Sequence, residues 1–405
     1  MSVLDQAPGA AKGLLDGENA GPTASRRGRP QRILHVLAGL AYGGIEIWLL
    51  NVLRATDREC YPMDFLVLTD QPGECDDEVW SLGGRVIPCP HPRRPWLVAR
   101  RVREILRTEG PYAVVHSHVH HYSGFLMRLA AQQGVPVRVV HSHNDTRAFE
   151  AGRRWPRPLY LALMRRWIRR YATDRIAVSR ESAEDLFGTN WAVEKNCQIL
   201  YCGIDFAPFS VAGDRLQTRA QIGLSPDALV IGHVGRFHPR KNHAFLLKIA
   251  AEAFARDPQA RLLCLGDGPL MHEIQSKARA MGIAERIVFA GSRADVPMLM
   301  TTVMDVFVLP SHHEGLSLAV LEAQAAGLPC VLADGLTKEG DVLPQLIHRL
   351  SLKAPPAKWA ECLLQLAGRA PMRREEALKA MSESDFSIHR SAVRLLQVYD
   401  AHPGD

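Results

Sequence analysis

Two glutamates, Glu314 and Glu322, lie eight positions apart and form the pair of side chains best suited to chemistry. The apolar run 305–309 precedes them and predicts a strand, and we expect a helix to open at about Gly315. Glu314 then lies in the strand-to-helix loop and Glu322 two turns into the helix, roughly 12 Å further along its axis. The free N–H groups and positive dipole end of a helix start suit a phosphate. With a carboxylate at each end, such a site can hold two hydroxylated rings joined by a diphosphate, which is the shape of a nucleotide-sugar. A capped helix start with an exposed glutamate is the alternative.

Two basic residues, Arg236 and Lys241, share a loop after the predicted strand Leu229–Val234. Both can neutralise a diphosphate leaving group. Asn242 follows them, and we expect it to cap the next helix. Two solvated surface cations are the alternative interpretation, but the position of the loop after the first strand of the second half favours a binding role.

A glycine pair, Gly43-Gly44, lies between the predicted strand Ile33–Leu37 and the next helix. Without side chains there, the backbone can approach a phosphate or a sugar closely. The full G-x-G-x-x-G spacing of dinucleotide-binding loops is absent. The segment 266–269, Gly-Asp-Gly-Pro, looks similar, but a tight turn before a helix explains it.

Histidines are concentrated in one part of the first half of the chain. They are His116, His118, His120, His121, His141 and His143. Residues at spacing two share one strand face, so the first three converge if the strand extends that far. Such a group predicts a metal centre of the kind found in hydrolases. No acidic residue lies near it in the sequence, however, so we favour His118 as a neutral hydrogen-bonding group at the end of the strand.

Short apolar runs alternate with helix-like segments along the whole chain. Near-continuous Val/Ile/Leu strands predict parallel sheets covered on both faces by helices. Their alternation with helices predicts two doubly wound Rossmann-like α/β domains, with ligands at the carboxyl ends of the strands. The expected strands are 33–37, 65–69, 86–89, 113–117, 138–142, 176–179, 198–201, 229–234, 262–265, 287–290, 306–309 and 330–333.

A chain of 405 residues is too long for one ordinary core. Glycines and prolines interrupt the pattern at 203–226, so we place the domains at 32–208 and 209–385. Residues 1–31, rich in Gly, Ala, Pro and Arg, predict a disordered tail. No apolar run approaches the ~20 residues of a membrane span, and no secretory h-region precedes the first domain. The eight cysteines include no CxxC pair, which favours reduced thiols and a cytoplasmic location.

Taken together, these motifs resemble glycosyltransferase family 4, the retaining enzymes of the GT-B fold. The resemblance covers nearly everything after residue 31, and its motifs occur in family order. They are the glycine loop, 115–118, 203–205, 235–242, 266–269 and Glu314 to Glu322. The segments 141–144 and 322–329 are most similar to members that build exopolysaccharide or capsule. The resemblance also implies that the residues 386–405 form a helix crossing back to the first domain.

The resemblance implies a role for each matching residue. Glu314 contacts the hydroxyls of the donor sugar, and Glu322 contacts the ribose. Arg236 and Lys241 stabilise the departing diphosphate, and His118 faces the transferred sugar. The remaining donor-binding positions are Gly43, Gly44, Ser292, Arg293, Gly315 and Leu316. No catalytic metal or other cofactor is implied, so protein cations supply the charge stabilisation.

Two segments of the first half are strongly basic. The segment 93–107 carries six arginines against one glutamate. In 159–171 the apolar residues form one stripe, and Arg165, Arg166, Arg169 and Arg170 lie on the other face. Such helices suit an anionic membrane surface, with packing of the stripe against the sheet as the alternative. The sequence shows no platform of aromatic and basic residues of the kind that binds nucleic acid, so we do not expect a nucleic-acid partner.

The sequence therefore predicts an α/β protein of GT-B architecture, with two Rossmann-like domains facing a central cleft. The expected activity is transfer of a hexose, with retention and by front-side attack, from a UDP-sugar to a glycan or lipid-linked acceptor in polysaccharide biosynthesis. Two alternatives are a metal-dependent hydrolase using His116, His118 and His120, and a nucleotide-sugar-binding protein without transfer activity. One departure from the family is a missing glycine-rich stretch after Asp334, where we expect the chain to run straight to a helix near Trp359.

Overall fold

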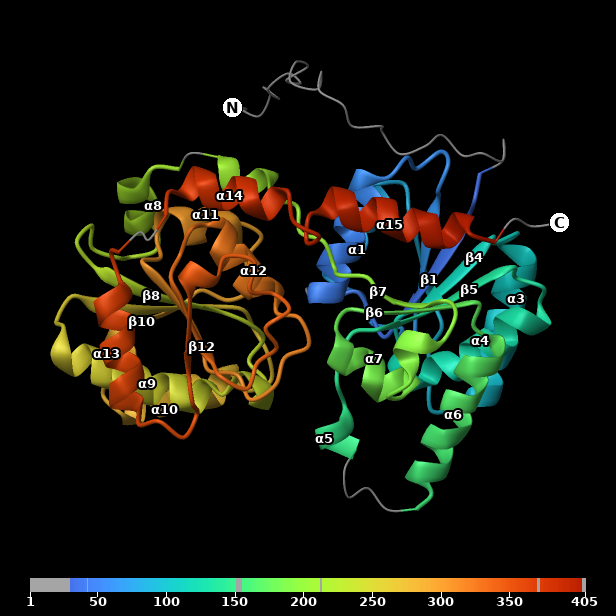
Figure 1. Ribbon diagram of the computed structural model, residues 1–405, viewed down its shortest axis with the longest axis horizontal. Coiled ribbons are helices and arrows are strands. Elements are labelled where there is room, and N and C mark those ends of the chain that lie inside the picture. The colour runs from blue at the N-terminus through green and yellow to red at the C-terminus, as the bar shows by residue number, and fades with distance from the viewer. Residues whose placement is uncertain (1–29, 42, 151–154, 212, 370–371, 403–405) are drawn as a thin grey trace.

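The protein consists of two α/β domains, each built on a parallel sheet (Figure 1). The structure, a computed structural model, describes residues 30–41, 43–150, 155–211, 213–369 and 372–402. The first sheet has seven strands in the order β3-β2-β1-β4-β5-β6-β7, and the second has six in the order β10-β9-β8-β11-β12-β13. In both, the order reverses beside the first strand of the domain, as in doubly wound folds. The predicted α/β class with two Rossmann-like domains is confirmed.

The strands follow the predicted runs with shifts of one or two residues. In the first domain they are β1 Ile33–Leu37, β2 Met63–Val67, β3 Arg85–Pro88, β4 Val114–Ser117, β5 Val137–Ser142, β6 Asp174–Ala177 and β7 Cys197–Ile199. In the second they are β8 Leu229–Val234, β9 Ala260–Leu265, β10 Ile287–Phe289, β11 Val306–Leu309, β12 Cys330–Ala333 and β13 Ile347–Leu350.

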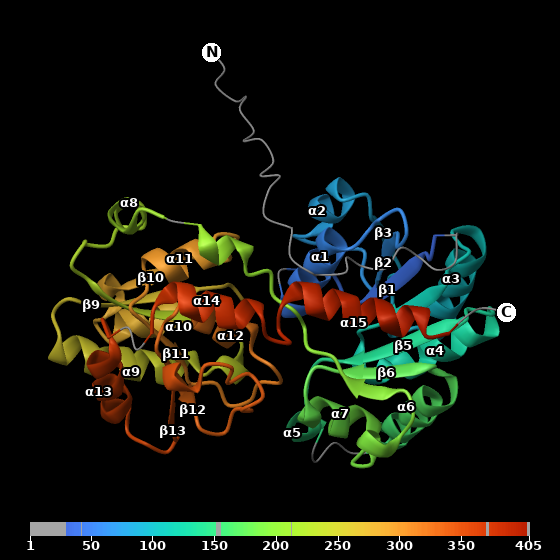
Figure 2. The ribbon, with the colours of Figure 1, turned by 45° about the horizontal axis from the view of Figure 1, so that its top comes forward.

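Helices cover both faces of each sheet (Figures 1 and 2). The first domain contains α1 Gly44–Ala55, α2 Asp76–Ser81, α3 Pro95–Thr108, α4 Ser123–Gln132, α5 Arg147–Glu150, α6 Arg157–Tyr171 and α7 Arg180–Phe187. The second contains α8 Arg215–Gln221, α9 His243–Arg256, α10 Met271–Ala280, α11 Val296–Thr302, α12 Leu318–Ala325, α13 Pro356–Leu366 and α14 Arg374–Ser382, and α15 Ile388–Asp400 follows as the last helix of the described residues.

Strand β1 shows why its sheet is apolar on both sides. Ile33 and Leu37 belong to one hydrophobic cluster and Leu34 and Val36 to another, because successive side chains point to opposite faces. His35 therefore shares a face with Ile33 and Leu37. This is the face on which α1 and α15 pack, and it is where the histidine cluster described below forms.

The chain crosses between the domains twice, and the two crossings lie side by side. The backbone N–H of Ile204 donates to Phe386 (2.8 Å), and the N–H of Ile388 donates back to Ile204 (2.9 Å). Beyond this point α15 lies on the first domain, where Trp48 Nε1 donates to Ser391 Oγ at 3.0 Å. Figures 1 and 2 show α14 on the second domain and α15 on the first, joined by this crossing.

Several details differ from the sequence-based expectations. Phe206 packs in the core of the second domain, so the chain changes domain before residue 208. Gln31 is buried and its amide donates to Asp400 at 2.6 Å, so it belongs to the first domain and not to the tail. The rest of the predicted tail, residues 1–29, lies outside the described residues. The chain after Asp334 does not run straight to a helix, because β13 intervenes.

Two further observations concern membrane-spanning helices and the cysteines. Within the described ranges, no helix combines the length and apolar character that a bilayer span requires. Cys264 and Cys330 are buried thiols, as predicted, whereas Cys197 is half-buried.

Candidate donor-binding site

The loops at the carboxyl ends of the two sheets meet between the domains. Arg240, after β8, donates to the side-chain oxygen of Asn144, after β5, at 3.3 Å. Gly315, after β11, lies so near the other domain that a Cβ there would come within 3.0 Å of the backbone oxygen of His143. These contacts bring candidate residues that are far apart in the sequence to the region between the two domains.

An ion pair between Lys241 and Glu314 joins the two strongest sequence motifs. Lys241 Nζ lies 2.8 Å from Glu314 Oε1, and the two side chains are only 15% and 12% exposed. A Cβ at Gly235 would lie 3.0 Å from Lys241 Cε, so the glycine leaves room for the lysine to cross the end of β8. In such a sheltered position a cation and a carboxylate interact more strongly than in water, because solvent screens them less. The sequence analysis gave these two residues separate roles and did not predict their ion pair.

The support beneath Lys241 was not expected from the sequence. The ring of Phe237 stacks on that of His243, with centroids 4.0 Å apart, and His233 Nδ1 lies 2.9 Å from the carbonyl oxygen of Val308. Burial lowers the pKa of His233 to about 4, so this ring is neutral beside Lys241. Asn242 does not act as the predicted side-chain cap: its backbone is left-handed, with φ 57°, and its side chain makes no capping bond.

The helix carrying Glu322 begins later than predicted. Helix α12 starts at Leu318, so Gly315 and Leu316 lie in the preceding loop with Glu314, and Glu322 lies in the second turn of a shorter helix. Backbone N–H groups of this loop and of the first turn of α12 therefore lie between the two glutamates. Burial raises the pKa of Glu322 from its ordinary value of 4.5 to about 7.

Strand β13, which the sequence analysis missed, organises the other wall of this site. Its Arg349 forms an ion pair with Asp341 at 2.7 Å and donates to the carbonyl oxygens of Leu336 and Thr337 at 2.8 and 2.9 Å. Together with Glu314 and its loop these residues line a small cavity of about 20 Å³. No spacing in the sequence links Arg349 to Glu314, so only the fold reveals this support.

Arg236 and the glycine pair approach one another from opposite domains. Arg236 is exposed and forms no ion pair within the described part of the chain. Across from it Glu46 lies in the first turn of α1, and burial raises the pKa of Glu46 to about 7, with the charge of Arg236 opposing the shift. A Cβ at Gly43 would lie 2.5 Å from Glu46 Oε2, and one at Gly44 would lie 3.3 Å from Leu318 of the second domain. A side chain at Gly44 would therefore press lightly on the second domain, whereas one at Gly43 would meet only the movable end of the Glu46 side chain.

His118 belongs to a buried cluster of five histidines from three neighbouring strands. Its Nε2 lies 3.1 Å from His35 Nδ1, and its Nδ1 lies 2.9 Å from His143 Nε2. Burial drives the pKa of His118 well below 6.5, so the predicted neutral state agrees with its surroundings. Both ring nitrogens are engaged by other rings, however, so neither is free for a sugar in this arrangement.

The strand does not extend far enough for His116, His118 and His120 to share one face. Strand β4 ends at Ser117, and His120 follows in a 3-10 helix with a φ of 50° that turns its side chain out of the row. His116 instead bonds the hydroxyl of Tyr399 in α15 at 2.7 Å. The metal-dependent hydrolase built on those three residues loses its ligand set.

Two of the predicted donor-binding residues lie exposed in the loop after β10. They are Ser292 and Arg293. The loop is anchored because the N–H of Gly266 donates to the carbonyl oxygen of Gly291 at 2.7 Å. The side chain of Arg293 pairs with Asp295 at 2.6 Å. The guanidinium of Arg293 is therefore held by a neighbour within its own loop.

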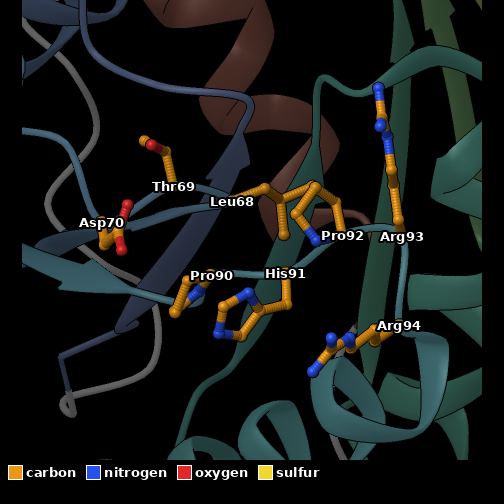
Figure 3. Close-up of a pocket in the computed structure, with 8 residues that line it drawn as sticks. All are labelled: Leu68, Thr69, Asp70, Pro90, His91, Pro92, Arg93 and Arg94. Carbon is orange, nitrogen blue, oxygen red and sulfur yellow. The ribbon is translucent and has the colours of Figure 1, made fainter.

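A larger hollow, of about 370 Å³, lies at the carboxyl ends of β2 and β3 in the first domain (Figure 3). Thr69 and Asp70 line one side and the segment 90–94 the other. In Figure 3 Arg93 extends away from the ring of His91, whereas Arg94 lies on the same side as that ring. A Cβ at Gly39 would lie 3.6 Å from Thr69, so the hollow adjoins the loop that carries the glycine pair.

The basic helix α6 is only partly as predicted. Leu161, Met164 and Ile168 are its buried residues, whereas Leu159 and Leu163 are 55% and 40% exposed. The apolar stripe therefore packs on the domain along one edge and faces outward along the other.

Two facing Rossmann-like domains, with a Lys–Glu pair at the strand ends of the second, indicate a transferase of the GT-B class, and comparisons with known proteins agree. A family model described as "Glycosyl transferases group 1" matches residues 228–369, and one described as "Glycosyl transferase 4-like domain" matches residues 43–200. The chain belongs to the GT-B glycosyltransferases of family 4.

Individual relatives support the same conclusion. The chain is 38% identical over 375 residues to EpsF of Bacillus subtilis (strain 168), a protein named as a glycosyltransferase, covering 91% of this chain and 96% of that protein. It is 31% identical over 232 residues, 55% of this chain and 58% of the relative, to the Escherichia coli UDP-Gal:alpha-D-GlcNAc-diphosphoundecaprenol alpha-1,3-galactosyltransferase. The crystal structure of Anabaena HepE with UDP-glucose superposes with a TM-score of 0.71 at 19% identity, covering 90% of this chain and 99% of HepE.

Proposed function

We propose that this glycosyltransferase moves a hexose from a UDP-sugar, with retention of anomeric configuration, to a glycan or lipid-linked acceptor. The observation that carries the proposal is the sheltered Lys241–Glu314 pair at the carboxyl ends of β8 and β11. It holds a cation and a carboxylate together where a sugar diphosphate reaches the strand ends of an α/β sheet.

The choice of donor rests on the relatives. The Escherichia coli relative is named for UDP-Gal, and HepE was crystallised with UDP-glucose. In this chain the half-buried Glu322 is suited to the two ribose hydroxyls, and the backbone at Ser292 and Arg293 to the uracil.

The chemistry follows from the charges at the site. As the glycosidic bond breaks, negative charge develops on the diphosphate, and Lys241 and Arg236 stabilise it without a catalytic metal. Glu314, held by Lys241, orients the sugar hydroxyls. The acceptor hydroxyl attacks on the face from which UDP departs and gives its proton to the leaving phosphate. His118 reaches the transferred sugar by exchanging its bond to His35 or His143 for one to the sugar.

The acceptor side is assigned to the first domain. The hollow beside Thr69 and His91 adjoins the glycine loop and has the volume to receive part of a glycan. The outward edge of α6, with Leu159 and Leu163 beside its arginines, is suited to the anionic inner face of the plasma membrane. We therefore propose a cytoplasmic, peripherally membrane-associated enzyme of exopolysaccharide synthesis.

Slow hydrolysis of the donor tests this function without knowledge of the acceptor. Purified protein is incubated with UDP-glucose or UDP-galactose, and ¹H NMR follows the anomeric signal of the first sugar released. Retention predicts that the α-anomer appears first, together with UDP. First release of the β-anomer contradicts retention, and no release of UDP from any UDP-hexose contradicts the proposed donor.

A further inference from the structure

His120 and His121, which the donor site does not use, form a separate group with Asp185. The two histidines follow β4 in the 3-10 helix His120–Tyr122, and Asp185 lies on α7. Each offers one ligand atom, and these atoms all lie within 4.8 Å of one another. Two imidazoles and one carboxylate form a common ligand set for first-row transition metals.

The contact between His120 and Asp185 is long and is not a well-aligned hydrogen bond. His120 Nε2 lies 3.3 Å from Asp185 Oδ2, and this nitrogen is buried without a hydrogen bond of good geometry among the described residues. Two ligands of a tetrahedral zinc ion, at bond lengths of about 2.1 Å, lie roughly 3.3–3.4 Å apart. The observed spacing therefore fits two ligands of a shared cation.

His121 provides a second, independent observation. Its side chain is 4% exposed, and neither of its ring nitrogens has a hydrogen-bond partner in the described part of the chain. A buried polar group without a partner costs about 1–3 kcal/mol. Coordination of an ion between the three side chains removes this cost for one nitrogen.

The surroundings of Asp185 orient it as the outer shell of a metal site does. The backbone N–H and the hydroxyl of Thr146 donate to Oδ2 at 2.6 and 2.7 Å. Arg165 approaches the other oxygen, Oδ1, at 3.5 Å and bonds the backbone oxygen of Asp185 at 2.8 Å. Hydrogen bonds of this kind fix the direction of a ligating carboxylate.

The neighbouring histidine cluster is a poorer place for a cation. His35, His116 and His118, and likewise His118, His141 and His143, bring three imidazoles together. Neither group contains a carboxylate, and His118 is bonded within both. A divalent charge there would be buried without an anion to balance it, which is strongly unfavourable.

We infer that His120, His121 and Asp185 bind one divalent transition-metal ion, with zinc the ion best matched to this set. The ion joins the segment after β4 to α7 and so stabilises the first domain. It does not touch the donor, and donor binding is expected to be independent of it.

Metal binding by the purified full-length protein tests this inference. Chelator-treated protein is titrated with Zn²⁺ by calorimetry and with Co²⁺ by visible absorbance, and bound metal is counted by mass spectrometry after gel filtration. One ion per chain is expected, with a Co²⁺ spectrum of tetrahedral type and a higher Tm. Asp185→Asn and His121→Ala should each weaken binding about 100-fold or more, since even changes outside the ligand shell cost 10–100-fold.

A matched control separates this site from histidine content in general. His402 forms a comparable pair with Asp174 at 2.6 Å, remote in sequence from the proposed ligands, and His402→Asn should leave metal binding unchanged. If His121→Ala is unstable, Asp185→Asn and His120→Asn carry the test. Binding of less than one ion, or equal binding by wild type and Asp185→Asn, overturns the inference. UDP affinity is measured alongside, and a failure there concerns the donor site and not the metal.

Discussion

Glu322→Gln should weaken donor binding and at the same time stabilise the folded protein at alkaline pH. Burial raises the pKa of Glu322 from 4.5 to about 7, so ionising this carboxyl is harder in the folded chain than in the unfolded one. Because the pKa of Glu322 is higher in the folded chain, its ionisation destabilises the fold. This loss of folding free energy is absent below about pH 4.5, grows between pH 4.5 and 7, and is constant above pH 7. It amounts to about 3 kcal/mol above pH 7 and to less than about 1 kcal/mol at pH 5.

The same substitution removes a charged partner of the ribose. Loss of a hydrogen bond to a charged group costs about 1.5–3 kcal/mol, which is roughly a 10- to 100-fold loss of UDP affinity. The assay combines UDP titration by calorimetry with thermal unfolding at pH 5 and pH 8, using Glu314→Gln as the control that should keep most of its UDP affinity and lose mainly kcat. At pH 8 the Tm of Glu322→Gln should exceed that of wild type by several degrees, at about 2–4 °C per kcal/mol. A Gln variant that is less stable than wild type at pH 8, or that binds UDP equally well, refutes the reasoning.

Four further outcomes are expected. Lys241→Gln leaves the Glu314 carboxylate without its cation and removes charge stabilisation from the leaving group. We therefore expect kcat to fall about 10²–10³-fold in steady-state assays. An unchanged kcat contradicts this role of Lys241. Tyr399→Phe leaves a buried nitrogen of His116 without its 2.7 Å partner, so urea unfolding should show a loss of about 1–3 kcal/mol with UDP affinity retained. Turnover should persist in EDTA, and a loss restored by Mg²⁺ or Mn²⁺ would point to a catalytic metal. A variant that replaces three exposed arginines of α6 by glutamine should bind anionic liposomes more weakly, by about 1 kcal/mol for each charge removed, in a sedimentation assay. Unchanged binding in ordinary salt would assign these arginines another role. These arginines are Arg166, Arg169 and Arg170.

Much of the fold could be predicted because its strands are apolar on both faces. The runs that became β1, β8, β11 and β12 match their predicted bounds. Strand β13 could not be predicted in this way: Ile-His-Arg-Leu is an edge strand whose four residues are all half-exposed, so it carries no apolar run. Helix α12 was expected three residues early because the spacing of apolar residues continues through Gly315 and Leu316, which the structure keeps in the loop.

The donor site was partly predictable for a related reason. Parallel strands end at one edge of a sheet, so ligands were expected at the carboxyl ends of the strands; the contact of Lys241 with Glu314 there was not predicted and follows because β8 and β11 are neighbours. The histidine cluster was not predictable from spacing, since it needs His35 from another strand and Tyr399 from the last helix. Alternation would bring His120 beside His118 only in a longer strand, but β4 ends at Ser117 and His120 is a left-handed residue that opens a 3-10 helix.

We propose that a nucleotide-sugar binds at the Lys241–Glu314 pair and the helix that carries Glu322, and that it is turned over there. A panel of UDP-, GDP- and ADP-sugars tests it most directly, with thermal shift and nucleotide release measured for wild type and Lys241→Gln side by side. A UDP-hexose should raise the Tm of the wild type and be consumed slowly with release of UDP, and Lys241→Gln should abolish the release. If no nucleotide-sugar shifts the wild-type Tm, or if Lys241→Gln releases UDP at the wild-type rate, the claim is contradicted.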